Sequence, residues 1–234
     1  MLDLFPDGFE EIERADGIEL VAYTDPGGEE RLWQAFGGVS SAADVAGGWE
    51  ERWRDFHRPV RVGPLWIGQS WQERPDDAIA VVIDPGRAFG TGAHPTTRLC
   101  LELLAGIEPA SLLDVGCGSG VLAIAAAKLG FAPVVAVDVD ERAIESADVN
   151  AAANGVDIEV RIVDSDEDVL PEADVVVANI TREAVESIAP RVRAATLVTS
   201  GYLVSQPAEL AGFVHVDRRA AEGWAADLHM RARH

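Results

Sequence analysis

The chain has 234 residues, 48% of them hydrophobic, which suffices for the core of one large domain or of one domain with a small one beside it. Its formal net charge of -21 at pH 7 argues against direct binding of nucleic acid, because proteins that bind it neutralise phosphates with Lys and Arg. No apolar run of about 18 residues is present to span a membrane, and the acidic N-terminus lacks the basic and then apolar order of a secretory signal.

Residues 1–55 form the first predicted unit, a small N-terminal domain, and residues 56–72 connect it to the rest of the chain. Within the first unit, Ile18–Thr24 has the composition of a short strand, and an amphipathic helix is expected to begin at Gly27. The connecting residues combine Gly, Pro and β-forming side chains, which predicts a linker that runs into a hairpin.

Residues 73–234 alternate between strand and helix patterns and form the second predicted domain. Near-continuous apolar strands separated by helices indicate a parallel, doubly wound sheet covered on both faces. Asp140 is expected to cap the start of the third helix, and Gly155 to end it. The predicted helices are Thr96–Gly106, Val121–Gly130 and Glu141–Gly155, and the predicted strands are Ser111–Gly116, Ala132–Asp138, Val156–Val163, Ala173–Ile180 and Ala194–Val204.

A glycine loop follows the first strand of this domain. In the pattern D-x-G-x-G-x-G, Asp114 lies at the strand end, and three glycines, at 116, 118 and 120, lead into a helix. Such a loop brings free backbone N–H groups close to a ligand, although an ordinary tight turn is the alternative. The third glycine comes one residue earlier than in the G-x-G-x-x-G of NAD-binding proteins. The loop therefore favours S-adenosylmethionine, whose ammonium group needs an acidic anchor that Asp114 can supply directly or through water.

Two further polar side chains stand at strand ends. Asp138 ends the second strand, where a carboxylate accepts both hydroxyls of a ribose, in NAD as well as in S-adenosylmethionine. Asn179 ends the fourth strand, where its alternative role is that of a simple strand-end cap. Because ligands of doubly wound sheets bind at the carboxyl ends of the strands, we expect Gly116, Asp138 and Asn179 to converge on one crevice.

No metal site is expected from the sequence. The five histidines are scattered, with no pair at the spacing of one helical turn. The two cysteines, Cys100 and Cys117, form no C-x-x-C pair, which indicates a reduced, cytoplasmic protein without structural zinc.

Four segments of the chain, among them DPGRAFGTGAHPTTRLCLELL and LLDVGCGSGVLAIAAAKLG, together resemble the PrmA family, the ribosomal protein L11 methyltransferases. The match runs from about residue 58 to about residue 202, and PLWIGQSW and Trp224 support it further. The pattern DPGxAFGTGxHPTT, at Asp84–Thr97, is its most specific part and is shared with protein-lysine methyltransferases related to this family. The four segments are DPGRAFGTGAHPTTRLCLELL, LLDVGCGSGVLAIAAAKLG, AVDVDERAIESADVNAAANGV and ADVVVANI.

The resemblance implies an α/β fold: the Rossmann-like, seven-stranded sheet of class I methyltransferases, mostly parallel and doubly wound, with a small, shortened N-terminal α+β domain for substrate recognition. It implies that S-adenosyl-L-methionine is the cofactor. The residues expected to contact the cofactor, from the motif and from the resemblance together, are Phe89, Thr97, Asp114, Gly116, Gly118, Gly120, Asp138 and Asn179.

The resemblance also implies a role for the glycine-rich segment. Phe89–Thr97 is expected to fold over the methionine end of the cofactor, with Gly90 and Gly92 allowing close approach or the hinge motion of a lid. His94 is interpreted as a hydrogen-bonding residue that fixes this loop rather than as a catalytic base, since no Ser or Cys nucleophile is paired with it.

The expected activity is methyl transfer to a lysine of ribosomal protein L11. Asn179 is the predicted catalytic residue, because its carbonyl groups accept amine hydrogens without adding charge. The alternatives are a lysine of another protein, such as an electron-transfer flavoprotein, a small amine, or a non-catalytic module that binds S-adenosylmethionine and a partner protein. We expect a cytoplasmic monomer with a protein substrate and with neither a nucleic acid nor a membrane as partner.

Overall fold

The computed structural model describes residues 10–14, 17–21, 59–84, 92–164 and 168–232, and the chain forms two compact units, residues 1–56 and 57–234. In the first unit, strands β1 (Glu10–Arg14) and β2 (Gly17–Val21) pair antiparallel as a hairpin. The strand β2 confirms the strand predicted at Ile18, whereas the helix expected from Gly27 lies outside the described residues.

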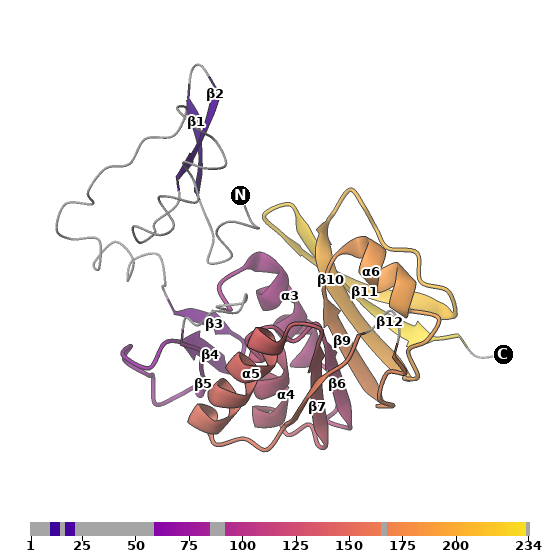
Figure 1. Ribbon diagram of the computed structural model, residues 1–234, viewed down its shortest axis with the longest axis horizontal. Helices are drawn as coiled ribbons and strands as arrows, with labels where there is room; N and C mark the ends of the chain where they lie inside the picture. The colour runs from indigo at the N-terminus through magenta and orange to yellow at the C-terminus, as the bar shows by residue number, and fades with distance from the viewer. Residues whose placement is uncertain (1–9, 15–16, 22–58, 85–91, 165–167, 233–234) are drawn as a thin grey trace. The chain divides into compact units, whose positions relative to one another are not determined.

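The second unit is built on a seven-stranded sheet with the strand order β11-β12-β10-β9-β6-β7-β8. The strands from β10 to β8 run parallel, and β11 and β12 add an antiparallel hairpin at one edge (Figure 1). This is the mostly parallel α/β sheet that the sequence predicts. Its strands are β6 (Leu112–Val115), β7 (Val134–Asp138), β8 (Glu159–Ile162), β9 (Val175–Asn179), β10 (Thr196–Leu203), β11 (Phe213–Ala221) and β12 (Trp224–Arg231).

Helices cover both faces of this sheet, because alternate residues of each buried strand point to opposite sides. Leu112 and Val175 pack with α3, α4 and α5 in one core cluster, whereas Leu113 and Val176 pack with α6 in another. None of the described helices has the length and apolar character needed to cross a membrane. The helices are α3 (Pro95–Leu104), α4 (Val121–Lys128), α5 (Glu141–Asn154) and α6 (Arg182–Ile188).

A second, three-stranded sheet joins β3 (Val60–Val62), β4 (Leu65–Gly68) and β5 (Ile79–Val82). The strands β3 and β4 form the hairpin that was expected after the linker, and β4 pairs parallel with β5. Asn154, at the end of α5, accepts a hydrogen bond from the Val82 amide at 2.9 Å and donates one to the Val82 carbonyl at 2.6 Å. The amide side chain thus binds the edge of β5 as a neighbouring strand would, and it ties this sheet to the helical layer.

Local capping explains where two of the helices begin and end. Asp140 accepts a hydrogen bond from the Arg142 amide at 3.0 Å, and Gly155 follows α5 with a φ of 64°, so both predicted ends of this helix are confirmed. The hydroxyl of Thr181 accepts from the Ala184 amide at 3.3 Å and so begins α6, which the sequence analysis did not identify. The strands β11 and β12 were also missed.

Candidate active site

Three neighbouring strands of the large sheet bring the predicted residues to one edge. The order β9-β6-β7 places the ends of these strands side by side, so Asn179, the glycine loop after Val115 and Asp138 lie along the same rim. The backbone amide of Gly116 donates to the Val137 carbonyl at 2.9 Å, and that of Gly118 donates to the Asp138 carboxylate at 2.9 Å. The loop is therefore bonded directly to the end of β7.

The glycines of the loop have positive φ values but different neighbours. A Cβ atom on Gly116, where φ is 73°, would lie 2.3 Å from Cγ2 of Ile180, the residue that follows β9. A Cβ atom on Gly120, where φ is 80°, would lie 3.0 Å from Cβ of Ala147, so this glycine lets α4 pack closely on α5. The first glycine thus shapes the rim, whereas the third serves the packing between helices.

Asp114 is buried beneath the loop, with 1% of its surface exposed. Its Oδ2 accepts a hydrogen bond from the Ala123 amide at 3.1 Å, while Oδ1 has no hydrogen-bond partner among the residues that the structure describes. The pKa of this carboxyl is raised to about 7, mainly by burial and also by the nearby charge of Asp138, against the lowering effect of the Ala123 bond. A buried acceptor without a partner is suited to a cationic ligand group that approaches from the rim.

Asp138 is half-buried, and the backbone holds its carboxylate in a fixed orientation. Oδ2 accepts from the Gly118 amide at 2.9 Å, and Oδ1 accepts from the Asp140 amide at 3.0 Å. Each carboxylate oxygen keeps a second lone pair, so both can still accept hydroxyl groups of a ligand. This geometry fits the ribose-binding role that the sequence predicts.

Asn179 and Thr97 meet at the rim although they are separated by 82 positions in the sequence. The Asn179 Nδ2 atom donates to the Thr97 hydroxyl oxygen at 3.4 Å, and Thr97 is buried in the first turn of α3. The hydroxyl therefore occupies the donor side of the amide, which leaves Oδ1 as the acceptor for another group. Phe89 and Gly90 lie outside the described residues, and Gly92 packs against Ile67, with the methyl Cγ2 of Ile67 at 2.5 Å from where its Cβ atom would lie.

His94 begins α3 and fixes its first turn. Its Nδ1 atom accepts from the Thr96 amide at 3.3 Å and lies 2.7 Å from the Thr96 hydroxyl, which agrees with a loop-fixing role. Burial, assisted by the charge of Arg98, lowers the pKa of the imidazole, while Glu222 opposes this effect. The ring also contacts Trp224 edge to face, at 5.0 Å between centroids.

The contact between His94 and Trp224 brings the β11–β12 hairpin to the rim. Arg98 of α3 forms an ion pair with Glu222 in the tip of this hairpin, which strengthens the same junction. From the sequence, Trp224 supports the family resemblance only, and no contact with His94 is predicted. The turn residues Glu222 and Gly223, with φ values of 53° and 81°, have the geometry of a tight hairpin, and the Glu-Gly pair was the available signal for it.

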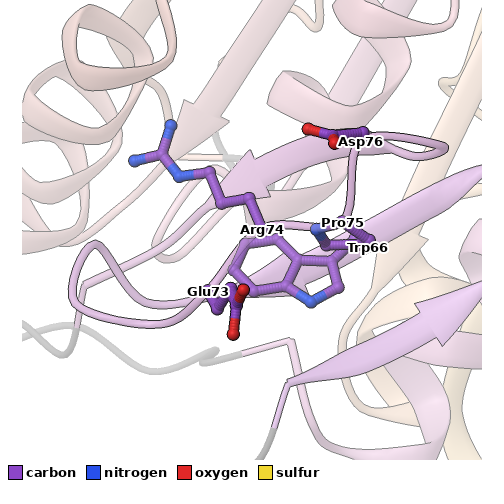
Figure 2. A pocket seen from close by; sticks show the side chains of 5 residues that line it. All are labelled: Trp66, Glu73, Arg74, Pro75 and Asp76. Atoms are coloured by element: carbon purple, nitrogen blue, oxygen red, sulfur yellow. The ribbon is translucent and has the colours of Figure 1, made fainter.

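A separate hollow of about 460 Å³ lies along the connection from β4 to β5, and none of the predicted site residues lines it. Figure 2 shows the side chains of Glu73, Arg74 and Asp76 spreading in different directions around the indole of Trp66. Binding sites usually have polar groups that converge on one point, so this hollow is not the candidate site. No group of three or more His, Cys, Asp or Glu side chains in the described part of the chain could hold a metal ion.

A doubly wound sheet with a D-x-G-x-G-x-G loop after its central strand and a carboxylate at the end of the next one defines a class I methyltransferase. The chain belongs to the ribosomal protein L11 methyltransferase (PrmA) family, whose sequence model matches residues 37–231. S-adenosylmethionine is the methyl donor of this class of enzyme. Asp114 Oδ1, which lacks a partner among the described residues, suits the ammonium group of this cofactor. The Asp138 carboxylate, held by two backbone amides, suits its ribose.

Known relatives place the chain in the same family. The ribosomal protein L11 methyltransferase of Shewanella sediminis is 44% identical over 175 residues, and that of Serratia proteamaculans is 45% identical over 175 residues; each alignment covers 70% of this chain. The chain spans about 60% of the length of these relatives. The crystal structure of a ribosomal protein L11 methylase from Lactobacillus delbrueckii subsp. bulgaricus is 29% identical, with a TM-score of 0.66, and the match covers 75% of this chain and 99% of that one.

Proposed function

We propose that this protein transfers a methyl group from S-adenosylmethionine to a lysine of ribosomal protein L11, in the cytoplasm and as a monomer. Family membership supports the reaction, and the names of the relatives support the acceptor. The observation on which the proposal depends most is the meeting of Asn179 and Thr97 beside the glycine loop and Asp138. An uncharged amide, which can accept hydrogen bonds from an amine, thus lies beside the predicted cofactor crevice.

Each predicted cofactor contact has a proposed task. Asp138 accepts the ribose hydroxyls, Asp114 balances the ammonium group, and Thr97 lies beside the methionine end. The bound cofactor supplies an activated methyl group on a sulfonium. The loop amides at Gly116 and Gly118 come near the cofactor, and Gly120 acts through the packing of α4 on α5. The cofactor contact expected of Phe89 stays a prediction, because this residue lies outside the described part of the chain.

Asn179 orients the acceptor amine in this mechanism. A lysine has a pKa of about 10.4, so its neutralisation at pH 7 costs roughly 4–5 kcal/mol, and a neighbouring carboxylate would increase that cost. The Oδ1 atom of Asn179, on the side of the amide away from the Nδ2 bond to Thr97, and its backbone carbonyl accept amine hydrogens without a charge. They align the nitrogen lone pair with the methyl group. No basic side chain is needed beside the amine, because water can take the proton.

The net charge of -21 supports a basic protein as the acceptor and argues against direct binding of RNA or DNA. The negative surface attracts a cationic partner from a distance. The reaction centre itself offers the neutral amide of Asn179, so the attraction need not raise the pKa of the lysine that reacts.

The test is incubation with labelled S-adenosylmethionine and either free ribosomal protein L11 or purified large ribosomal subunits, followed by mass mapping. We expect label on a lysine of ribosomal protein L11. In the variant Asn179→Ala, turnover should fall at least about a hundredfold while the cofactor dissociation constant changes little, because Asn179 serves the acceptor.

Three outcomes would contradict the proposal. Label only on another protein would retain the reaction and remove ribosomal protein L11 as the acceptor. Cofactor binding without any transfer would indicate a non-catalytic module. An equal loss of turnover and cofactor affinity in Asn179→Ala would remove the acceptor-orienting role.

A further inference from the structure

A buried polar network lies beside the proposed active site, and the proposed mechanism does not use it. It lies in the antiparallel part of the sheet, on the face of β10 opposite to the Ser200 side chain. Four of its side chains are at most 3% exposed, and two more reach it from β11. The buried members are Thr199, Tyr202, Asp227 and His229, and the members on β11 are His215 and Arg218.

The Asp227 carboxylate is the centre of this network. Its Oδ1 accepts from Arg218 Nε at 2.7 Å and from His215 Nε2 at 2.9 Å. Its Oδ2 accepts from Arg218 Nη2 and from the Tyr202 hydroxyl, both at 2.8 Å. Burial alone would raise the pKa of Asp227, but the bonds from Arg218, Tyr202 and His215 outweigh it and lower the pKa below its ordinary value. The carboxylate is therefore ionised and is a strong anchor for Tyr202.

The Tyr202 hydroxyl bridges an irregularity in β10. It lies 2.7 Å from the Thr199 hydroxyl, three positions earlier, and the pairing of β10 with β12 shifts register between Ser200 and Tyr202. Gly201 is the extra residue in this bulge, with a φ of 102°. On the opposite face, the Ser200 hydroxyl donates to the Ala225 carbonyl at 2.7 Å. Side-chain bonds thus fix the bulge from both of its flanks.

The bulge touches the backbone of the residue that follows Asn179. A Cβ atom on Gly201 would lie 1.9 Å from the carbonyl oxygen of Ile180, so the Gly201 backbone lies directly against that peptide. On its other side, the Ile180 side chain lies against Gly116 of the cofactor loop. Ile180 is therefore clamped between two glycines, and the pairing of β9 with β10 ends at Asn179, opposite Ser200. The position of Gly201 sets where the Asn179 carbonyls can lie.

We propose that Tyr202 is a positioning residue for methyl transfer: its hydroxyl bonds fix the Gly201 bulge, and the bulge holds Ile180 and Asn179 where the acceptor amine is received. The inference depends on the proposed role of Asn179. Tyr202 is buried, with its hydroxyl bonded to Thr199 and Asp227, so its proposed action is through the backbone. Asp227 contributes by holding the hydroxyl, and Thr199 contributes by closing the bridge across the bulge.

The test is the variant Tyr202→Phe, which keeps the ring and removes the hydroxyl. We expect kcat for ribosomal protein L11 to fall about tenfold, because small displacements of positioning groups have large effects on rate. The cofactor dissociation constant, measured by calorimetry, should stay within about twofold, because Asp114 and Asp138 are untouched. Thr199→Val, which removes the other end of the bridge, should give the same pattern and serves if Tyr202→Phe does not fold.

The matched control is Ser111→Ala. The Ser111 hydroxyl donates to Asp174 at 2.6 Å and accepts from the Asp174 amide at 2.8 Å, at the amino ends of β6 and β9, far along both strands from the rim. This variant also loses a side-chain bridge, although an exposed one, so it controls for the removal of a hydroxyl away from the rim. We expect its kcat to match that of the wild type.

A second readout does not need an acceptor. In amide-resolved NMR of the cofactor-free protein, Tyr202→Phe should shift the Ile180 amide and the side-chain NH₂ of Asn179, whereas Ser111→Ala should leave both in place. Unchanged signals for these two groups in Tyr202→Phe, or an unchanged kcat, would overturn the inference. If the wild type fails to methylate ribosomal protein L11, the proposed function fails, and the NMR result alone then decides the role of Tyr202.

Discussion

Asp114 combines complete burial with one oxygen that lacks a partner among the described residues. Its raised pKa, about 7, means that the carboxyl is partly protonated at neutral pH when no cation is bound. The ionised form attracts an ammonium group and the protonated form does not, so the protonation state of this one residue should control cofactor affinity.

We therefore predict that cofactor affinity depends on pH through Asp114. Below pH 7 the carboxyl becomes neutral, and the affinity for S-adenosylmethionine should fall about tenfold for each pH unit. Above pH 7 this slope should flatten as the carboxyl becomes fully ionised. Calorimetric titration between pH 5.5 and 8.5 measures this slope, and in Asp114→Asn the affinity should be weak and show no such slope. A slope that persists in the variant would assign the effect to another group.

Two glycines at helix ends have left-handed backbones but different surroundings. Gly120 begins α4 with a positive φ and faces Ala147 of α5, whereas Gly155 follows α5 with a positive φ of 64° and has nothing within 4 Å of a Cβ position. At both positions any other residue would strain the backbone, but only at Gly120 would its side chain also meet Ala147. The two glycines are therefore a matched pair for mutation.

Gly120→Ala should therefore destabilise the protein more than Gly155→Ala does. The strain of a left-handed backbone costs about 1 kcal/mol in both variants. The clash with Ala147 should add roughly 1–3 kcal/mol to the first one alone. Urea unfolding followed by circular dichroism gives the free energy of unfolding of both variants. Equal losses of stability would contradict the prediction, since the contact with Ala147 would then cost nothing.

The buried elements of the second unit are the ones that the sequence predicts well. The strands β6, β7 and β9 are near-continuous apolar runs that end at Gly or at a polar residue, so their predicted and observed ends agree within a few positions. The glycine loop, Asp138 and Asn179 could be assigned because each stands at such a strand end. Asp140 and Gly155 were predictable for a similar reason, since capping is local.

The missed elements depend on contacts between distant parts of the chain. The strand β11 lies at the sheet edge and has a register shift between His215 and Asp217, so its apolar and charged residues do not alternate regularly. Helix α6 is short and has no long periodic pattern. The bridge from Tyr202 to Asp227 and the contact of His94 with Trp224 join residues that no local pattern relates.

At the scale of the whole molecule, the charge of -21 should act on encounter rather than on chemistry. Salt screens attraction over a Debye length of about 10 Å at 0.1 M, so added salt weakens steering of a basic acceptor. Between 50 and 500 mM NaCl, we predict that kcat/KM for ribosomal protein L11 falls about tenfold while kcat stays nearly constant. Steady-state kinetics in a salt series would reveal this, and a fall confined to kcat would contradict it.

The most direct test of the central claim, that the rim of the large sheet binds S-adenosylmethionine, is calorimetric titration of the wild type and of Asp138→Ala. The wild type should bind one equivalent. The variant would lose the two hydrogen bonds that we propose from ribose hydroxyls to the Asp138 carboxylate, so its affinity should be at least about a hundredfold weaker. No binding by the wild type at millimolar ligand, or equal affinity in the two proteins, would contradict the account.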